Sequence, residues 1–206
     1  MAERPDHLPS EPARGEPQWT PPGSPAYRRI SLALFLAGFA TFSLLYCVQP
    51  LLPVLAETFQ VGAAASSLAL SLSTGLLAPS ILLAGGLSES ISRKTLMFVS
   101  LCAASLLNLA AAFAPSWPVL LVLRALEGIM LGGVPAIAMA YLAEEIHPGG
   151  LGRTMGLYVG GTAFGGMLGR VITGFVSQEA GWHVAMAAIG ALGLAAAILF
   201  LFLLPP

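Results

Sequence analysis

The stretch that decides the fold reads GGLSESISRK at residues 85–94. Apolar residues dominate the chain on both sides of it, over residues 68–84 and 96–114. The stretch itself carries one acid, followed by the two adjacent cations Arg93 and Lys94. A short charged segment between two long apolar stretches predicts a tight turn that joins two membrane spans.

The composition indicates that lipid is the solvent of this chain. Hydrophobic residues make up 56% of it and charged residues only 9%, whereas an ordinary soluble domain has about 25% charged residues. A water-exposed surface cannot be built from so few charges. We therefore expect the lipid bilayer as a partner and no nucleic acid. None of the three histidines has other metal-binding residue types near it in the sequence. Neither a metal site nor a cofactor is therefore expected.

Six apolar segments are long enough to be transmembrane helices, because a span needs about 20 residues at about 1.5 Å per residue. They predict an all-α membrane protein in which residues 30–206 form a six-helix bundle. Residues 1–29 hold seven prolines and are predicted to be a disordered cytoplasmic tail. The predicted spans are 30–52, 66–87, 95–114, 118–142, 154–176 and 184–204.

The cations orient this bundle, because Lys and Arg near span ends accumulate on the cytoplasmic side. With six spans, seven of the nine cations fall on one face and the loops of the opposite face carry none. Both termini are therefore predicted to be cytoplasmic, in a multi-pass membrane protein. The seven are Arg4, Arg14, Arg28, Arg29, Arg93, Lys94 and Arg153.

Three charges fall inside predicted spans. Arg124 and Glu127 are three residues apart, which places them on one helical face, where they can pair. Arg170 lies in the next span at a similar predicted depth. Because a charge at the helix centre costs about 2.5–3.5 kcal/mol on insertion, all three should face the bundle interior.

Two interpretations of these charges remain open. In the functional one, Glu127 binds and releases a proton in a water-accessible cavity while Arg124 and Arg170 tune it. In the structural one, a fixed Arg-Glu-Arg network only locks two helices together. Among the uncharged polar residues, Gln49 and Asn108 are candidates for a solute pathway.

The fifth predicted span is rich in glycine. Gly152, Gly156 and Gly160 form one ladder at four-residue spacing, and a second ladder follows at residues 161, 165 and 169. Small residues at this spacing let membrane helices approach closely. The sequence therefore predicts close helix packing, together with a helix able to bend.

These motifs together resemble the major facilitator superfamily. The opening stretch resembles the family loop G-x-L-a-D-r-x-G-r-k at Gly85, Leu87, Arg93 and Lys94. The segment LLVLRALEG at residues 120–128 is similar to the family pattern l-x-x-x-R-x-x-q-G. Residues 156–166 are similar to a glycine-rich motif of proton-driven exporters. The likeness runs from about residue 28 to the end. Within the family, the chain resembles bacterial inner-membrane exporters of the drug and sugar efflux type, which implies a location in the bacterial inner (plasma) membrane.

The resemblance implies roles for particular residues. Arg124 would be the membrane-embedded arginine associated with proton coupling, and Glu89 with Arg93 would belong to a cytoplasmic latch. The sequence departs from the family at Glu89, which replaces an aspartate, and at Glu127, which replaces a common glutamine and adds a titratable group. The exporter motif would comprise Gly156, Gly160 and Gly165.

Family members usually have twelve helices in two halves, with the solute site between them. This chain corresponds to the N-terminal half, so we expect a second six-helix half or a self-dimer as partner. The expected function is export of a small organic solute, a drug or sugar, by proton-coupled antiport. The alternative is a truncated, non-transporting protein or an interaction subunit. No G-x-S-x-G setting is present, so an enzyme is not expected.

Overall fold

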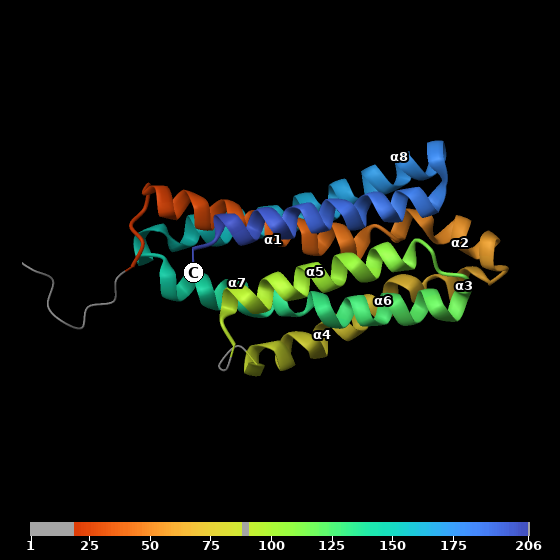
Figure 1. The fold of residues 1–206 in the computed structure, drawn as a ribbon, viewed down its shortest axis with the longest axis horizontal. Coiled ribbons are helices and arrows are strands. Elements are labelled where there is room, and N and C mark those ends of the chain that lie inside the picture. The colour runs from red at the N-terminus through yellow and green to blue at the C-terminus, as the bar shows by residue number, and fades with distance from the viewer. Residues whose placement is uncertain (1–18, 88–90, 206) are drawn as a thin grey trace, which may run out of the picture.

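The computed structural model describes residues 19–87 and 91–205, which form a bundle of helices (Figure 1). The predicted all-α class is confirmed, because no strand occurs in these described residues beyond a bridge between Thr20 and Ile146. The elements in chain order are α1 (Pro25–Tyr46), the 3-10 helix η1 (Gln49–Leu51), α2 (Leu52–Phe59), α3 (Ala63–Ser66), α4 (Leu68–Leu87), α5 (Arg93–Ala111), α6 (Trp117–Leu131), α7 (Gly133–Glu145) and α8 (Pro148–Leu203).

Helix α1 begins earlier than the predicted span. The Ser24 hydroxyl accepts a hydrogen bond from the backbone N–H of Tyr27 at 3.1 Å, and Pro25 occupies the first helical position. Serine as N-cap and proline at the first position both favour a helix start. The predicted tail boundary at residue 29 is therefore corrected, because residues 25–29 are helical; residues 1–18 lie outside the described part.

Proline explains why two predicted spans are each built from more than one helix. Pro50 has no N–H to donate to the carbonyl of Tyr46, where α1 ends, and the chain continues through η1 into α2. Pro135 likewise has no N–H for the carbonyl of Leu131, where α6 gives way to α7. The chain continues as helix beyond each proline, and Pro25–Phe59 and Trp117–Glu145 both stay long and apolar enough to cross a membrane.

Helix α8 contains both of the last two predicted spans. Within it, Gly181 has φ 85° and ψ 163°, a conformation that is not helical and that suits glycine. Figure 1 shows that the chain turns back within α8, so that its two arms lie side by side. Counting α8 as one, five helical segments of the described chain are long and apolar enough to cross a membrane. The count of six spans stays a prediction.

The first arm of α8 packs directly on α1 through one of the two glycine ladders. A Cβ on Gly161 would lie 2.4 Å from the carbonyl oxygen of Phe35, and one on Gly165 would lie 2.1 Å from that of Phe39. No real side chain fits at such distances, so glycine is required for this approach. The predicted close packing is thus present on this face of α8.

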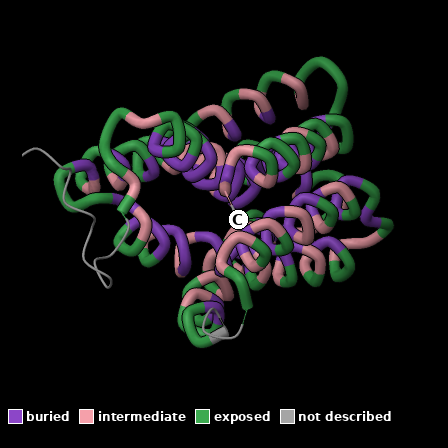
Figure 2. Tube along the Cα trace, turned by 60° about the vertical axis from the view of Figure 1, so that its left-hand side comes forward, coloured by how far each residue is buried: buried purple, intermediate pink, exposed green. Residues whose placement is uncertain are grey.

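The outer surface of the bundle is apolar. In Figure 2 buried positions gather toward the middle of the bundle and exposed positions lie on the outer faces. Large apolar side chains are among the exposed ones: Leu82, Phe113 and Phe202 are 80%, 73% and 71% exposed. Lipid, rather than water, suits such a surface.

The cations of the described loops and helix starts gather at one end of the bundle. Figure 1 shows that α1, α5 and α8 all begin there. Arg29 donates to the carbonyl oxygen of Phe202 at 2.9 Å, and Lys94 donates to the carbonyl oxygen of Leu204. We call this end the arginine-rich end, and it comprises Arg28, Arg29, Arg93, Lys94 and Arg153.

Candidate functional site

The centre of the candidate site is an ion pair inside the bundle. Arg124 Nη1 lies 2.5 Å from Glu127 Oε2, and both side chains are fully buried. The two residues occupy successive turns of α6, so the pair forms as their spacing indicates. A buried charge is tolerated when it is paired and hydrogen-bonded, and α6 alone supplies both charges.

Backbone carbonyls of two other helices take up the remaining hydrogen bonds of Arg124. Nη2 donates to the carbonyl of Leu45 at 2.8 Å, Nη1 to that of Leu44 at 3.3 Å, and Nε to that of Ala69 at 3.0 Å. The carbonyls in α1 lie in its last turn, where no further helical N–H is available. Arg124 therefore caps α1 and ties it to α4 and α6.

Asn108 extends this network to two more helices. Its Oδ1 accepts from Arg124 Nη1 and from Cys47 Sγ, each at 3.4 Å, and its Nδ2 donates to the carbonyl of Met186 at 2.8 Å. The network thus joins α1, α4, α5, α6 and α8. Asn108 is fully buried, which argues against its predicted contact with solute.

Glu127 has one oxygen left over. Oε2 meets Arg124, whereas the buried Oε1 has no hydrogen-bond partner among the described residues. Nearby, Ser73 Oγ donates to the carbonyl of Arg124 at 2.8 Å, and a Cβ on Gly128 would lie 2.3 Å from the carbonyl oxygen of Ser73. A carboxylate held on one oxygen and free on the other can take a proton without losing its place.

Arg170 does not join the Arg124–Glu127 pair. Its Nε donates to Gln49 Oε1 at 2.6 Å, its Nη1 donates to the carbonyl of Gly166 at 3.1 Å, and its guanidinium lies 4.2 Å above the ring of Tyr46. The predicted Arg-Glu-Arg network is therefore corrected to a pair and a separate arginine. The reason is position: Arg124 is fully buried inside the bundle, whereas Arg170 bonds to the exposed side chain of Gln49 in η1.

Because Arg170 is separate from the pair, it leaves one net positive charge within the fifth predicted span. Arg124 and Glu127 neutralise each other, whereas Arg170 has no ion-pair partner in the described chain. Gln49, which holds it, is exposed. The sequence singled out Arg170 and Gln49 separately and missed Tyr46; the spacing of Tyr46 and Gln49 near the end of α1 was the available signal.

The loop motif is held by residues outside it. Arg93 Nη2 donates to Glu144 Oε1 at 2.6 Å, which links the start of α5 to the end of α7. Ser92 caps α5 by accepting from the Thr95 N–H at 3.2 Å. The sequence did not identify Glu144 as the partner of Arg93. Gly85 lies in the last turn of α4, and Leu87, whose side chain is not described, is the last residue of that helix. Glu89 lies outside the described residues.

The three glycines of the exporter motif do not share one role. Gly165 packs against α1, but a Cβ on Gly156 or Gly160 would meet nothing within 4 Å. The packing predicted for Gly156 and Gly160 is therefore not formed within the described chain. Helical periodicity explains this, because each step along an α-helix turns by about 100° and so separates residues 160 and 161.

Comparison with known proteins agrees with this geometry. The family model described as Major Facilitator Superfamily matches residues 34–206. The chain belongs to that superfamily. This confirms the family resemblance that the loop, the α6 motif and the glycine-rich motif indicated, and it makes membrane transport the general function of the chain's relatives.

Similar proteins cover most of this superfamily chain but only part of their own length. The Bacillus subtilis "Uncharacterized MFS-type transporter YybF" is 51% identical over 89% of this chain and 46% of its own. The Escherichia coli "Inner membrane transport protein YnfM" is 48% identical over 89% of this chain and 44% of its own. The Candida albicans "MFS antiporter QDR3" is 30% identical over 57% of this chain and 17% of its own. The chain thus spans less than half the length of these relatives.

Proposed function

We propose that this chain forms half of a transporter that exports a small organic solute, a drug or sugar, in exchange for protons. The observation that carries the proposal is the buried Arg124–Glu127 pair, with a carboxylate oxygen that no described residue occupies. Intramembrane ionisable residues are functional candidates by default. A relative named as an antiporter agrees with this class of mechanism.

The proton step follows from the charge of the pair. When Glu127 accepts a proton on Oε1, Arg124 becomes an uncompensated charge in a buried site. Breaking a buried pair by removing one charge costs about 3–5 kcal/mol. Because Arg124 holds α1, α4, α5 and α6 together, this cost acts on the packing of the helices and favours a second arrangement.

The solute step is assigned to the separate cluster on the exposed side. Arg170 and Gln49 present polar groups there, beside the ring of Tyr46. In the proposed transporter this face lines the cavity between two halves, as solute sites in such transporters do. The proton step then acts through the carbonyls of Leu44 and Leu45 in α1, and the solute step acts on the side chain of Gln49 in η1.

A second half would cover surface that is open here. Among the described residues, a Cβ on Gly156 or Gly160 would meet nothing within 4 Å, so these glycines leave a strip of α8 open. Close packing of membrane helices uses such small residues. The arginine-rich end would lie in the cytoplasm of a bacterial cell, with the protein in the inner membrane, because cations accumulate on that side.

The alternative is a non-transporting subunit that docks through the same glycine strip. It is favoured by the open faces of Gly156 and Gly160. Mass measurement after crosslinking in mild detergent tests for the partner that both proposals require, and solute movement in proteoliposomes distinguishes the two. A dimer or a complex with a second polypeptide is required for transport, and a solitary monomer contradicts it.

The proton-coupling proposal is tested with the purified chain in proteoliposomes carrying a pH gradient. Ethidium represents drugs and a radiolabelled hexose represents sugars. We expect gradient-driven movement of one probe, and in Glu127→Gln we expect exchange to persist while the gradient no longer drives it. A Glu127→Gln variant that responds to the gradient like the unmodified chain would exclude Glu127 as the proton carrier.

A further inference from the structure

One face of α1 runs from the arginine-rich end to the cluster of Arg170 and Gln49. Its members recur at alternating steps of four and three residues, which places them on the same side of an α-helix. A helix rises about 1.5 Å per residue, so this face extends over about 27 Å. Its members are Arg28, Leu32, Phe35, Phe39, Phe42 and Tyr46.

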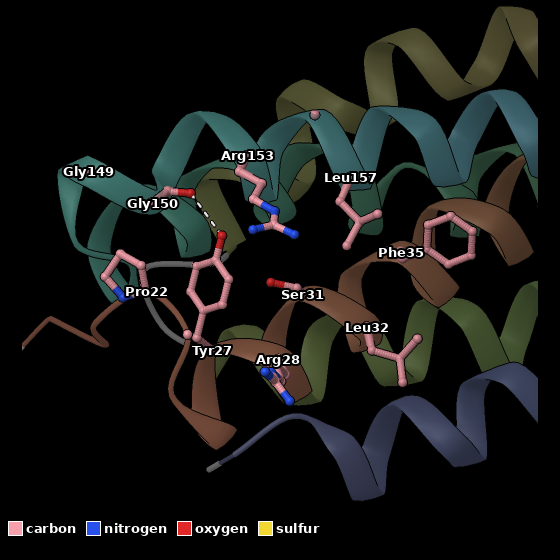
Figure 3. A pocket seen from close by; sticks show the side chains of 12 residues that line it. Pro22, Tyr27, Arg28, Ser31, Leu32, Phe35, Gly149, Gly150, Arg153 and Leu157 are labelled. Atoms are coloured by element: carbon pink, nitrogen blue, oxygen red, sulfur yellow. Dashed lines mark hydrogen bonds between the residues drawn. The ribbon is translucent and has the colours of Figure 1, made fainter.

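The first arm of α8 lies along this face and meets it at three levels. At the arginine-rich end, Arg153 and Arg28 line one cavity with a volume of about 810 Å³, as Figure 3 shows. In the middle, the ring of Phe164 lies 6.3 Å from the ring of Phe39. At the far end, the guanidinium of Arg170 lies over an aromatic ring of α1. The two helices therefore line one path with cations at both ends.

The protein does not neutralise the positive charge along this path. No Asp or Glu occurs in α1 or at residues 148–178 of α8. Of the described carboxylates, only Glu127 falls within a predicted span, and its charge is balanced inside its buried pair. Arg28 and Arg153 form no ion pair or hydrogen bond with a described residue. The excess within the spans is therefore one positive charge, that of Arg170.

Arg170 has donors left for an anion. A guanidinium carries its N–H groups in a planar fork. Nε donates to Gln49 and Nη1 to the carbonyl of Gly166, whereas Nη2 donates to no described residue. Nη1 and Nη2 together can therefore bind both oxygens of a carboxylate. Because Gln49 and the ring of Tyr46 already hold the guanidinium, little freedom is lost when an anion binds.

Between its two cationic ends the path is lined by aromatic rings. Phe164 on α8 is 45% exposed, and Phe35, Phe39 and Phe42 on α1 are half-buried. Such rings bind apolar and aromatic groups by burial and by stacking. A solute that fits this path therefore combines one negative charge with an apolar body.

We propose that the solute is an organic monoanion, a carboxylate that Arg170 binds while its apolar body lies along the phenylalanines of α1 and α8. One negative charge matches the one excess positive charge, whereas a cationic solute would bring a like charge beside Arg170. The inference rests on the proposed function and narrows it, because it assigns a charge to the exported solute.

The test compares three compounds of the same shape that differ in charge at neutral pH. Benzoate is negative, benzamide is neutral and benzamidine is positive. Each is radiolabelled, and its equilibrium binding is measured on the purified chain in nanodiscs of phosphatidylcholine, a lipid without net charge. We expect benzoate to bind about tenfold more tightly than benzamide, because hydrogen bonds to charged groups contribute more than neutral ones, and benzamidine to bind most weakly. Equal binding of benzoate and benzamide, or no binding of benzoate, would overturn the proposal.

Substitution of Arg170 tests whether this side chain sets the preference. In Arg170→Gln, benzoate should lose its advantage over benzamide. In Arg170→Lys, which keeps the charge without the planar fork, it should keep part of that advantage. The matched control is Arg29→Gln, because Arg29 bonds to the carbonyl of Phe202 and does not line the cavity. Benzamide binding in each variant reports that the path is intact. An unchanged preference in Arg170→Gln, or an equal loss in Arg29→Gln, would contradict the proposal.

The cationic cavity at the arginine-rich end should attract the same anion from a distance. In Arg28→Gln combined with Arg153→Gln, benzoate binding should weaken at low salt and match the unmodified chain at high salt, because salt screens long-range attraction. The loss in Arg170→Gln should persist at high salt, since Arg170 contacts the carboxylate. Unchanged binding in the double variant at low salt would remove Arg28 and Arg153 from the anion path.

This test and the test of the proposed function fail in different ways. If ethidium or hexose moves with the pH gradient and benzoate does not bind, the proposed transport is supported and the anionic solute is wrong. If benzoate binds through Arg170 and none of the compounds moves, the anion site is supported and the proposed transport is wrong.

Discussion

Arg124 and Glu127 lie one turn apart on α6 and meet at 2.5 Å with neither side chain exposed. The arginine also reaches carbonyls of α1 and α4 and the amide of Asn108 in α5. One side chain therefore joins α1, α4, α5 and α6 at one point. A change at this pair is felt both as stability and as helix arrangement.

Replacing Arg124 by Gln should destabilise the chain by about 3–5 kcal/mol, because it leaves Glu127 buried without its partner. Denaturant unfolding in mixed micelles gives the free energy of unfolding. The double variant Arg124→Gln, Glu127→Gln should lose less than Arg124→Gln alone, because no unpaired charge remains. A double variant that loses the sum of the single effects would show that the two charges act independently.

The two glycine ladders should respond with opposite sign to alanine. In Gly165→Ala the new Cβ would lie 2.1 Å from the carbonyl of Phe39, so α8 must move off α1, at a cost of about 1–3 kcal/mol. In Gly160→Ala the Cβ meets nothing, and alanine in place of glycine favours the helix by up to about 1 kcal/mol. Unfolding free energies of the two variants decide this. Similar losses in both would contradict the assignment of faces.

The Arg93–Glu144 pair should matter little for stability. The Glu144 side chain is 65% exposed, and exposed ion pairs contribute about 0–1 kcal/mol. A double-mutant cycle with Arg93→Gln and Glu144→Gln measures the coupling, and the reversed pair Arg93→Glu with Glu144→Arg should restore it. A coupling well above this range would indicate that the link between α5 and α7 is structural in its own right.

Arg170→Gln should impair transport more than stability. Its contacts with Gln49 and Tyr46 lie on the exposed side, where substitutions usually change stability by about 0.5 kcal/mol or less. Movement of ethidium and hexose in proteoliposomes is measured beside the unfolding free energy. The matched control is Arg29→Gln, which also removes one cation. Unimpaired transport in Arg170→Gln would remove Arg170 from the proposed solute path.

The arginine-rich end should face the cytoplasm. In a background without Cys47 and Cys102, the variants Arg153→Cys and Gly62→Cys place one thiol at each end, both at exposed positions. A membrane-impermeant maleimide added to intact cells should label Gly62→Cys alone, and permeabilised cells should show both. The reverse pattern would invert the proposed topology.

Much of this architecture was readable from local pattern. Hydrophobic length predicted the apolar segments, and the three-residue spacing indicated the Arg124–Glu127 pair. The prediction failed where a helix end depends on hydrogen bonds: α1 starts at Pro25 because Ser24 caps it. Pattern also treated the two glycine ladders alike, although only one of them contacts α1.

The sequence by itself determined the solvent of the chain, its helical class and the distribution of its charges, because these follow from composition and from periodicity along one helix. Only the tertiary structure decided which charges meet. Arg170 and Glu127 have similar predicted depth, yet Arg170 turns to Gln49 and Tyr46 instead. The direction in which a helix presents a side chain depends on how it packs against its neighbours. The loop GGLSESISRK predicts a turn between two membrane spans, but the partner of its Arg93 is Glu144, which belongs to α7.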